Sequence, residues 1–304
     1  MNERVVVGLN GKPGARFAMY WALYYARPHK LDVELVHVVE PDERPTSAEE
    51  RREELREAMA RLTRDVADAK KIAPDLRVTS RLMHGTPAQA LSERSEGAKL
   101  VVIGSTRLDI SPDVVHSTGV AQLAAESECS VVVVPQTPAV PGTGIVVGVD
   151  GSDASLAAVS FAAEMADRQR QTLTVVFAQT GPPVGGKAST HNDSLRWPLE
   201  QGDDERLVIA EAVAGLAQQY PDLIVRSRIS HAEPVDALYL AARNARMVVV
   251  GSHGLRGRTR YWMGSTSYDL VLTMPCVVAV IKADASRPRA ATRAARPTVT
   301  TERK

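Results

Sequence analysis

The chain has 304 residues, of which 44% are hydrophobic, 24% charged and 4% aromatic, and its formal net charge is +1. This length suits about two domains of roughly 150 residues, and the composition argues against disordered and membrane-protein classes. The balanced charge and the scarcity of aromatic residues argue against a dedicated nucleic-acid binder.

In the first half of the chain, short apolar runs alternate with longer segments of helical spacing. Runs of valine, isoleucine and leucine without polar alternation are typical of strands buried on both faces of a parallel sheet. Strands are predicted over residues 5–9, 33–39, 78–83, 100–103 and 131–134, and helices over residues 15–26, 47–72, 87–97 and 118–127.

A connector rich in proline and glycine, residues 137–143, separates this half from a second series of the same kind. Proline and glycine at such density indicate a surface linker. The second series predicts strands over residues 145–149, 173–178, 224–229, 247–250 and 277–281, and helices over residues 155–170, 203–219, 234–244 and 265–274.

The two halves repeat each other in sequence as well as in pattern. The segments at 4–11, 84–91 and 99–105 match those at 144–151, 231–238 and 246–252, in the same order. A repeat on this scale predicts two similar α/β domains, residues 1–138 (half one) and 143–283 (half two), each with a five-stranded parallel sheet covered by helices on both faces. Residues 284–304 are basic and lack apolar periodicity, so they are predicted to be a disordered tail; a role in binding nucleic acid or an acidic partner is the alternative.

A phosphate-binding loop is predicted in half two, directly after the apolar run 247–250. Gly251, Gly254, Gly264 and Ser265 supply a loop that can take φ > 0 and a helix start whose backbone N–H groups are open to an anion. Glycines are also ordinary turn residues, so the loop alone is weak evidence for a nucleotide. His253 is interpreted as a backbone donor in this turn, because no carboxylate is placed to orient it as an acid or base.

Asp150 follows the first strand of half two and is the predicted partner of this loop. If the first and fourth strands are neighbours, its carboxylate can accept hydrogen bonds from a ribose or help to hold a metal near phosphate. Its alternative role is that of a turn or N-cap residue before Ser152. Arg256, together with Arg258 and Arg260, can offset phosphate charge, although an exposed, solvated loop is the alternative.

Other patterns do not support an enzyme or a metalloprotein. The stretch 181–187 resembles a P-loop, but Ala188 stands where the magnesium-binding Ser or Thr belongs. The histidines form no HExxH or Cys/His cluster, so no metal site of the protein alone is expected. Cys129 and Cys276 each lie beside a valine-rich run and are predicted to be buried free thiols, with a disulfide or redox pair as the alternative. The N-terminus lacks a secretory hydrophobic segment, so a cytoplasmic protein is expected.

Taken together, the repeat and the loop resemble the universal stress protein family, and the resemblance covers both halves. The nucleotide-binding pattern of its ATP-binding members, Gly-x2-Gly-x9-Gly-Ser/Thr with an Asp after the first strand, is matched by Gly251, Gly254, Gly264, Ser265 and Asp150. The resemblance implies a Rossmann-like fold of the adenine nucleotide alpha hydrolase type. It also implies ATP as the ligand, with any Mg²⁺ held together with the ATP.

Further residue roles come from the resemblance alone. It implies that Gly148 and Val149 flank the base and sugar, that the Ala178 backbone meets the adenine, and that Val250 and Thr266 complete the pocket. It also implies that domains pair through their last strands, within this chain or, as a further option, in a homodimer.

Half one departs from this pattern at most positions. Gly104 and Thr118 are kept, but Arg107 and Ser117 replace the second and third glycines and Asn10 replaces the Asp. A side chain at Arg107 penalises a left-handed turn by about 1–2 kcal/mol. Half one is therefore predicted to bind ATP weakly or not at all.

The leading functional hypothesis is a cytoplasmic stress-response protein in which ATP binding, mainly in half two, shifts conformation or partner binding. A slow ATP hydrolase is the first alternative, suggested by Arg256 and Arg258, although no positioned general base is visible. A nucleotide-independent scaffold is the second.

Overall fold

The structure is a computed structural model, and it describes residues 3–40, 47–105, 115–136, 142–178, 203–253 and 263–283, with the backbone alone at 115–118 and 203–204. Most of the predicted linker, the P-loop-like stretch 181–187 and the predicted tail 284–304 lie outside the described residues.

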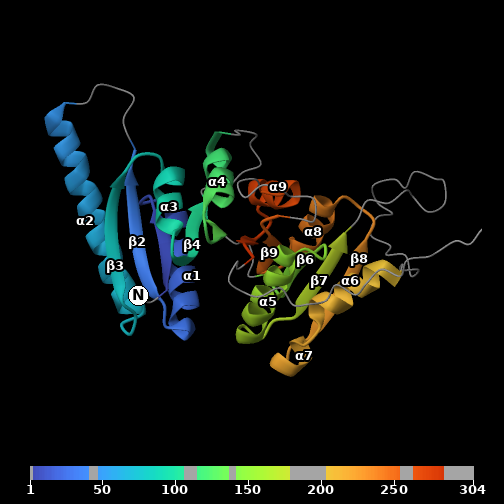
Figure 1. Cartoon of the computed structure of the whole chain (residues 1–304). Helices are drawn as coiled ribbons and strands as arrows, with labels where there is room; N and C mark the ends of the chain where they lie inside the picture. The colour runs from blue at the N-terminus through green and yellow to red at the C-terminus, as the bar shows by residue number, and fades with distance from the viewer. Residues whose placement is uncertain are drawn as a thin grey trace, which may run out of the picture.

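Strands and helices alternate through both halves (Figure 1). Half one contains β1 (Arg4–Leu9), α1 (Pro13–His29), β2 (Asp32–Val39), α2 (Ala48–Ile72), β3 (Val78–His84), α3 (Pro87–Ser95), β4 (Ala98–Ser105), α4 (Val115–Glu126) and β5 (Ser130–Pro135). Half two contains β6 (Ile145–Val149), α5 (Asp153–Arg168), β7 (Leu173–Ala178), α6 (Asp203–Val213), α7 (Leu216–Gln219), β8 (Val225–Ser230), α8 (Pro234–Ala242), β9 (Met247–Gly251), α9 (Ser265–Thr273) and β10 (Val277–Ile281).

One predicted helix is wrong in its extent. The segment 203–219 is not continuous, because Gly215 adopts the left-handed conformation with φ of 82° between α6 and α7. At this point the Ala214 N–H turns back to the carbonyl of Glu211, three residues earlier, and α7 starts afresh. Glycine takes φ > 0 without the steric cost of a Cβ, so it allows the reversal that a helical pattern alone does not reveal.

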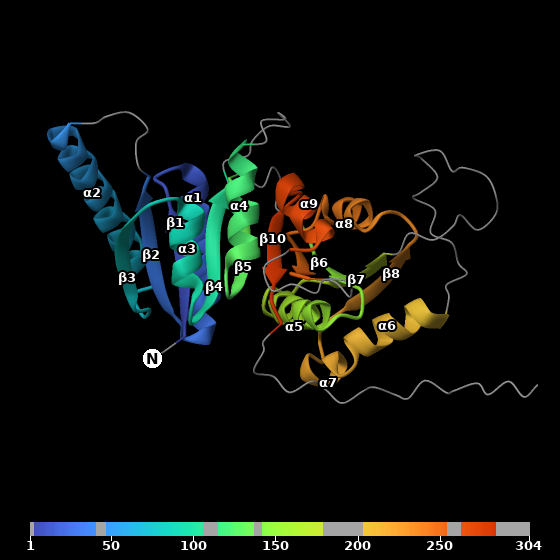
Figure 2. The same cartoon turned by 45° about the horizontal axis from the view of Figure 1, so that its top comes forward.

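The described strands form one sheet of ten, in the order β3-β2-β1-β4-β5-β10-β9-β6-β7-β8. Within each half all neighbouring strands are parallel. The two halves meet where β5 and β10 pair antiparallel, with Val133 opposite Val278 (Figure 2). Valine-rich strands suit this arrangement, because helices cover both faces and bury most residues of the central strands.

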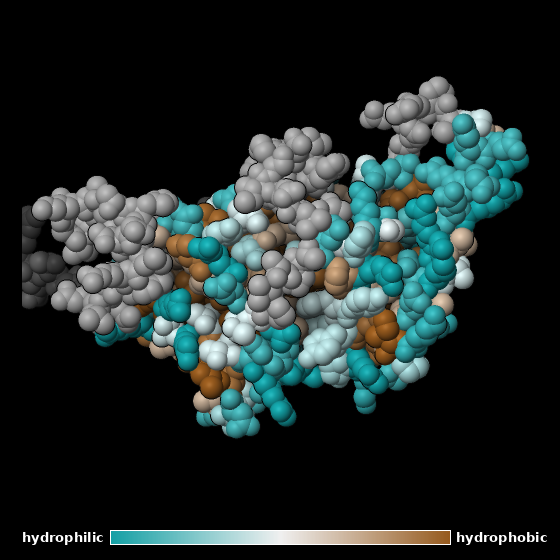
Figure 3. Space-filling view, turned by 180° about the vertical axis from the view of Figure 1, so that it is seen from behind, coloured by the Kyte–Doolittle hydropathy of each residue, from teal (hydrophilic) through white to brown (hydrophobic). Residues whose placement is uncertain are grey.

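Two layers of apolar side chains hold the helices against the sheet. On one face α1, α2, α5 and α6 pack over side chains such as Val7 and Val147. On the other, α3, α4, α8 and α9 pack over Val6 and Val146. Seen from behind, hydrophobic residues reach the described surface in separate patches among hydrophilic ones (Figure 3). No helix in the described part of the chain combines the length and apolar character needed to cross a bilayer.

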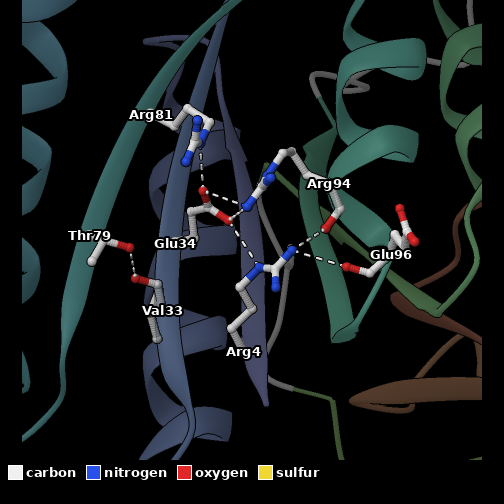
Figure 4. Close-up of polar contacts among 7 residues, drawn as sticks. All are labelled: Arg4, Val33, Glu34, Thr79, Arg81, Arg94 and Glu96. Carbon is white, nitrogen blue, oxygen red and sulfur yellow. Dashed lines mark hydrogen bonds and ion pairs between the residues drawn. The ribbon is translucent and has the colours of Figure 1, made fainter. Parts of the chain in front are cut away.

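Half one also contains a charged cluster around a buried carboxylate, the Glu34 cluster, made of Arg4, Glu34, Arg81 and Arg94 (Figure 4). Glu34 lies in β2 and is only 5% exposed. Its carboxylate accepts hydrogen bonds from Arg4 Nε at 3.1 Å, Arg81 Nε at 3.0 Å and Arg94 at 2.8 Å. Arg4 also donates to the carbonyls of Arg94 and Glu96, which ties β1 to the end of α3.

Candidate functional site

The strand order of half two reverses between β6 and β9. From β6 the chain moves outward to β7 and β8, and it then returns to the other side of β6 as β9, with Val147 beside Val249. Because the strands are parallel, their carboxyl ends lie at the same edge of the sheet. Asp150 and Ser252 therefore follow neighbouring strands at a topological switch point, where open α/β sheets bind ligands.

Asp150 forms a tight turn between β6 and α5. Its Oδ1 lies 3.0 Å from the backbone N of Ser152 and 2.6 Å from the Ser152 hydroxyl. Gly151 follows with φ of 81°. Ser152 in turn caps α5 by accepting from the backbone N–H of Ser155 at 3.1 Å. Asp150 thus has the local turn role that the sequence left as an alternative, at the position predicted for the ribose partner.

Ser152 also connects this turn to the loop after β9. Its hydroxyl lies 3.3 Å from the His253 carbonyl oxygen, so it can donate either there or to Asp150. His253 Nδ1 lies 2.9 Å from the hydroxyl of Ser252, which is buried. The two segments predicted to act together, 101 residues apart at Ser152 and His253, are therefore in direct contact.

Close packing explains why position 251 is a glycine, and the sequence did not indicate this. A Cβ at this position would lie 2.8 Å from the Ala154 carbonyl carbon and 2.9 Å from the Ser155 nitrogen. The first turn of α5 thus lies directly against the end of β9. In half one the same contact is closer, because a Cβ on Gly104 would lie 2.3 Å from the carbonyl carbon of Gly14.

The N-terminus of α9 lies at the same edge of the sheet. Gly264 donates its N–H to the Ser252 carbonyl at 2.9 Å, and the Ser267 hydroxyl donates to the Gly251 carbonyl at 2.6 Å. Ser265 is exposed and Thr266 is half-buried. The unpaired N–H groups of this first turn carry partial positive charge that favours an anion.

The remaining predicted residues contribute backbone more than side chain. Val149 and Val250 are 5% and 4% exposed and point into the apolar layers. Gly148 lies against Leu238, whose Cδ1 would be 2.9 Å from a Cβ there. Ala178 ends β7 beside Ser230 of β8.

Several predicted residues fall beyond what the structure describes. Gly254 and Arg256, with Arg258 and Arg260, lie outside the described residues, as does Arg107 in half one. Ser117 and Thr118 lie in the first part of α4, where the backbone alone is described.

Asn10 keeps the turn of half one without the charge of Asp150. Its Oδ1 accepts from the Lys12 N–H at 3.1 Å, and Gly11 follows with φ of 73°. The turn therefore needs only an acceptor oxygen, which either an amide or a carboxylate supplies. Sequence comparison of the halves missed this shared geometry, as it missed the connecting roles of Ser152 and Ser267.

The chemistry of the remaining titratable groups is limited. Among the described residues no group of three or more His, Cys, Asp or Glu side chains is placed to hold a metal ion. Cys129 and Cys276 are free and buried. Burial raises the pKa of each thiol to about 12, so neither is a reactive thiolate near neutral pH.

These features define a protein of two tandem α/β halves with a candidate ligand site at the switch point of the second. The sequence model of the universal stress protein family matches residues 1–135 and again 143–282. The chain therefore belongs to the universal stress protein family and carries its characteristic unit twice.

Curated relatives agree with this assignment along nearly their whole length. A universal stress protein of Mycolicibacterium smegmatis is 29% identical over 293 residues, covering 91% of this chain and 96% of the relative. One from Mycobacterium tuberculosis is 27% identical over 317 residues, covering 94% and 98%. Among solved structures, a universal stress protein from Archaeoglobus fulgidus has the same fold with a TM-score of 0.66, at 15% identity and with 93% and 97% coverage.

Proposed function

We propose that half two binds an adenine nucleotide, with ATP as the ligand, and that its occupancy regulates conformation or partner binding in a cytoplasmic stress response. The observation that carries this proposal is the direct contact between the Asp150 turn and the loop after β9, through Ser152 and the His253 carbonyl. The proposal also rests on family membership and on the glycine pattern from Gly251 to Ser265.

In this proposal the phosphates lie over the N-terminus of α9, where Ser265 and Thr266 present the first-turn N–H groups. The ribose meets Asp150, and the adenine meets the backbone at Gly148 and Ala178. Any Mg²⁺ would arrive with the nucleotide and be held mainly by its phosphates.

Half one is proposed to bind nucleotide weakly or not at all. Asn10 keeps the turn but not the negative charge, and Arg107 and Ser117 replace two glycines of the loop. We also propose 1–138 and 143–283 as the domain boundaries, which the family matches at 1–135 and 143–282 support. The antiparallel contact of β5 with β10 favours pairing of these domains within one chain, and light scattering would reveal any homodimer.

The first test is isothermal titration of the full chain with ATP, comparing Thr266→Glu with its half-one counterpart Thr118→Glu. A carboxylate at a helix N-terminus does not destabilise the helix, because it complements the macrodipole. It does repel a phosphate from the same N–H groups. We expect wild type and Thr118→Glu to bind about one ATP per chain and Thr266→Glu to bind none; equal binding by both variants would refute the phosphate position.

Asp150→Asn tests the carboxylate separately from the turn. Asn10 demonstrates that an amide oxygen sustains the same turn, so this variant keeps the fold where Asp150→Ala would lose the Ser152 hydrogen bonds. We expect ATP affinity to fall about tenfold if the carboxylate accepts hydrogen bonds from the ribose hydroxyls, equivalent to about 1.4 kcal/mol. Unchanged affinity would remove Asp150 from the ligand contacts.

Thermal unfolding with and without ATP separates the proposal from a nucleotide-independent scaffold. A ligand at a hundred times its Kd stabilises the native state by about 2.7 kcal/mol. A scaffold would give no shift in Tm and no heat in the titration. Phosphate release above that of Thr266→Glu would instead identify a slow hydrolase.

A further inference from the structure

A polar hollow of about 330 Å³ lies in half two, far along the sheet from the switch-point site. Its lining residues come from the amino ends of β6, β7 and β8 and from the C-terminal part of α8 and the residues just after it. Figure 1 labels these elements. Its lining includes Gly144, Thr174, Arg226, Arg228 and Ala241. This is the opposite end of the strands from Asp150 and Ser252.

The same place in half one is filled by the Glu34 cluster. The strand registers establish the equivalence, because Glu34 lies between Val6 and Thr79 as Thr174 lies between Val146 and Arg226. Both helices above begin at the proline of the matching segments, Pro87 and Pro234. By these registers and helix starts, each residue of the Glu34 cluster has a counterpart in half two. Gly144 corresponds to Arg4, Thr174 to Glu34, Arg228 to Arg81 and Ala241 to Arg94.

Half two therefore lacks the buried carboxylate and two of the three arginines that surround it in half one. Gly144 and Ala241 remove the bulk of two guanidinium side chains, and Thr174 removes the acid. The space that these side chains fill in half one (Figure 4) is the space that is hollow in half two.

Compared with the Glu34 cluster of half one, the hollow retains one arginine, has further arginines at other positions and lacks the carboxylate. Arg228 occupies the position of Arg81, Arg226 replaces the neutral Thr79, and Arg170 also lines the space. In the described part of the chain no acidic side chain lines the hollow, and Arg226 forms no ion pair. A guanidinium group attracts oxyanions and binds carboxylate or phosphate through paired hydrogen bonds, and Arg226 is the group of the hollow that offers this chemistry.

We propose that this hollow binds a compact anion, bearing carboxylate or phosphate groups, whose acidic group takes the place that the Glu34 carboxylate has in half one. The volume fits a small metabolite-sized ligand. Thr172, Thr174 and Asn244 add hydroxyl and amide groups that can orient it. Half one, with its own carboxylate already bound, has no corresponding site.

The test is titration of the full chain with citrate and, separately, with inorganic pyrophosphate, at constant ionic strength. We expect saturable binding of about one anion per chain, and the tighter of the two identifies a carboxylate or a phosphate ligand. Only binding that Arg226→Thr, or a folded Thr174→Glu variant, weakens is assigned to the hollow, since pyrophosphate can also reach the α9 N-terminus.

Thr174→Glu supplies the carboxylate that Glu34 provides in half one, so it should weaken anion binding at least about tenfold and leave ATP binding unchanged. Arg226→Thr restores the half-one residue at that position and should weaken binding by a similar factor. Because Arg226 is exposed, this second variant tests the site even if Thr174→Glu folds poorly.

Arg243→Thr is the matched control for net charge. Arg243 is exposed at the end of α8 and does not line the hollow. It should change anion affinity less than about twofold. The proposal is overturned if neither anion binds at millimolar concentration, or if Arg226→Thr and Arg243→Thr weaken binding equally.

Discussion

Replacing Glu34 by glutamine tests whether the Glu34 cluster stabilises half one. The substitution keeps the size and shape of the side chain but removes its negative charge. The three arginines around it would then share a neutral amide whose single oxygen cannot accept all their hydrogen bonds. Arg4, Arg81 and Arg94 would be left close together without a counter-charge.

The expected loss follows from the burial of each partner. Removing one member of a fully buried ion pair costs about 3–5 kcal/mol. The Glu34 side chain is 7% exposed, but those of Arg81 and Arg94 are 53% and 26% exposed, so water partly solvates the arginines. Allowing for that screening, we expect the free energy of unfolding to fall by about 2–3 kcal/mol.

The pH dependence has a definite sign. Burial by itself raises the pKa of the Glu34 carboxyl, but hydrogen bonds from Arg94 and Arg81 and the charges of Arg94 and Arg4 outweigh it, and the net pKa is lowered. A lowered pKa stabilises the folded state above the unfolded value of about 4.3, and this stabilisation is lost as the pH falls through the folded value. The difference between wild type and Glu34→Gln should therefore shrink in acid.

Urea denaturation near pH 7 and near pH 4 measures both effects. A triple variant, Arg4→Gly with Glu34→Thr and Arg94→Ala, copies the lining of half two. It removes the buried carboxylate together with two of the three arginines that surround it. It should be more stable than Glu34→Gln, because removing both partners costs less than isolating one. A Glu34→Gln loss below about 0.5 kcal/mol, or one that is the same at both pH values, would refute the reasoning.

Three further predictions concern packing, thiol burial and capping. Gly104→Ala should lower the free energy of unfolding by about 2–4 kcal/mol, because its Cβ would lie 2.3 Å from Gly14. At Gly119 in α4 an added Cβ meets nothing within 4 Å, so Gly119→Ala should raise the free energy of unfolding by about 0.5–1 kcal/mol. Equal effects of the two variants in urea titrations would contradict this. Cys129 and Cys276, with pKa values of about 12, should resist a thiol reagent near pH 8 until the chain unfolds, and rapid labelling of the native protein would contradict their burial. Ser47→Ala removes the capping box with Glu50 and should cost about 1 kcal/mol in thermal unfolding, unless α2 contributes nothing to stability.

Apolar periodicity predicted the strands and most helices to within a few residues, because valine-rich runs and proline-led helices leave strong local signals. It failed at Gly215, where one residue with φ of 82° divides a segment whose apolar spacing continues on both sides. Pairing of the halves through their last strands was expected from family resemblance alone, and its antiparallel sense was not predicted, since the apolar patterns of β5 and β10 contain no information about which strand lies beside them.

At the candidate site, sequence comparison selected positions for ligand binding and missed the packing roles that the structure gives to some of them. Gly104 persists in half one although the rest of the glycine pattern is lost, and that persistence was a signal for close packing against α1. Glu34 within the run Val33 to Val36 was a similar signal, because a charge inside an apolar strand needs partners. Those partners come from β1, β3 and α3, which no local pattern brings together.

The β5–β10 junction has a consequence for solubility. Residues 131–134 are four consecutive valines and β10 is equally free of charge, so either strand would template intermolecular stacking if its edge were open. The chain places these two edges against each other. The outer edges of the sheet, β3 and β8, instead carry exposed Arg81 and Arg228, which discourage the addition of another strand. Resistance to aggregation therefore depends on the contact between the halves as much as on the stability of either one.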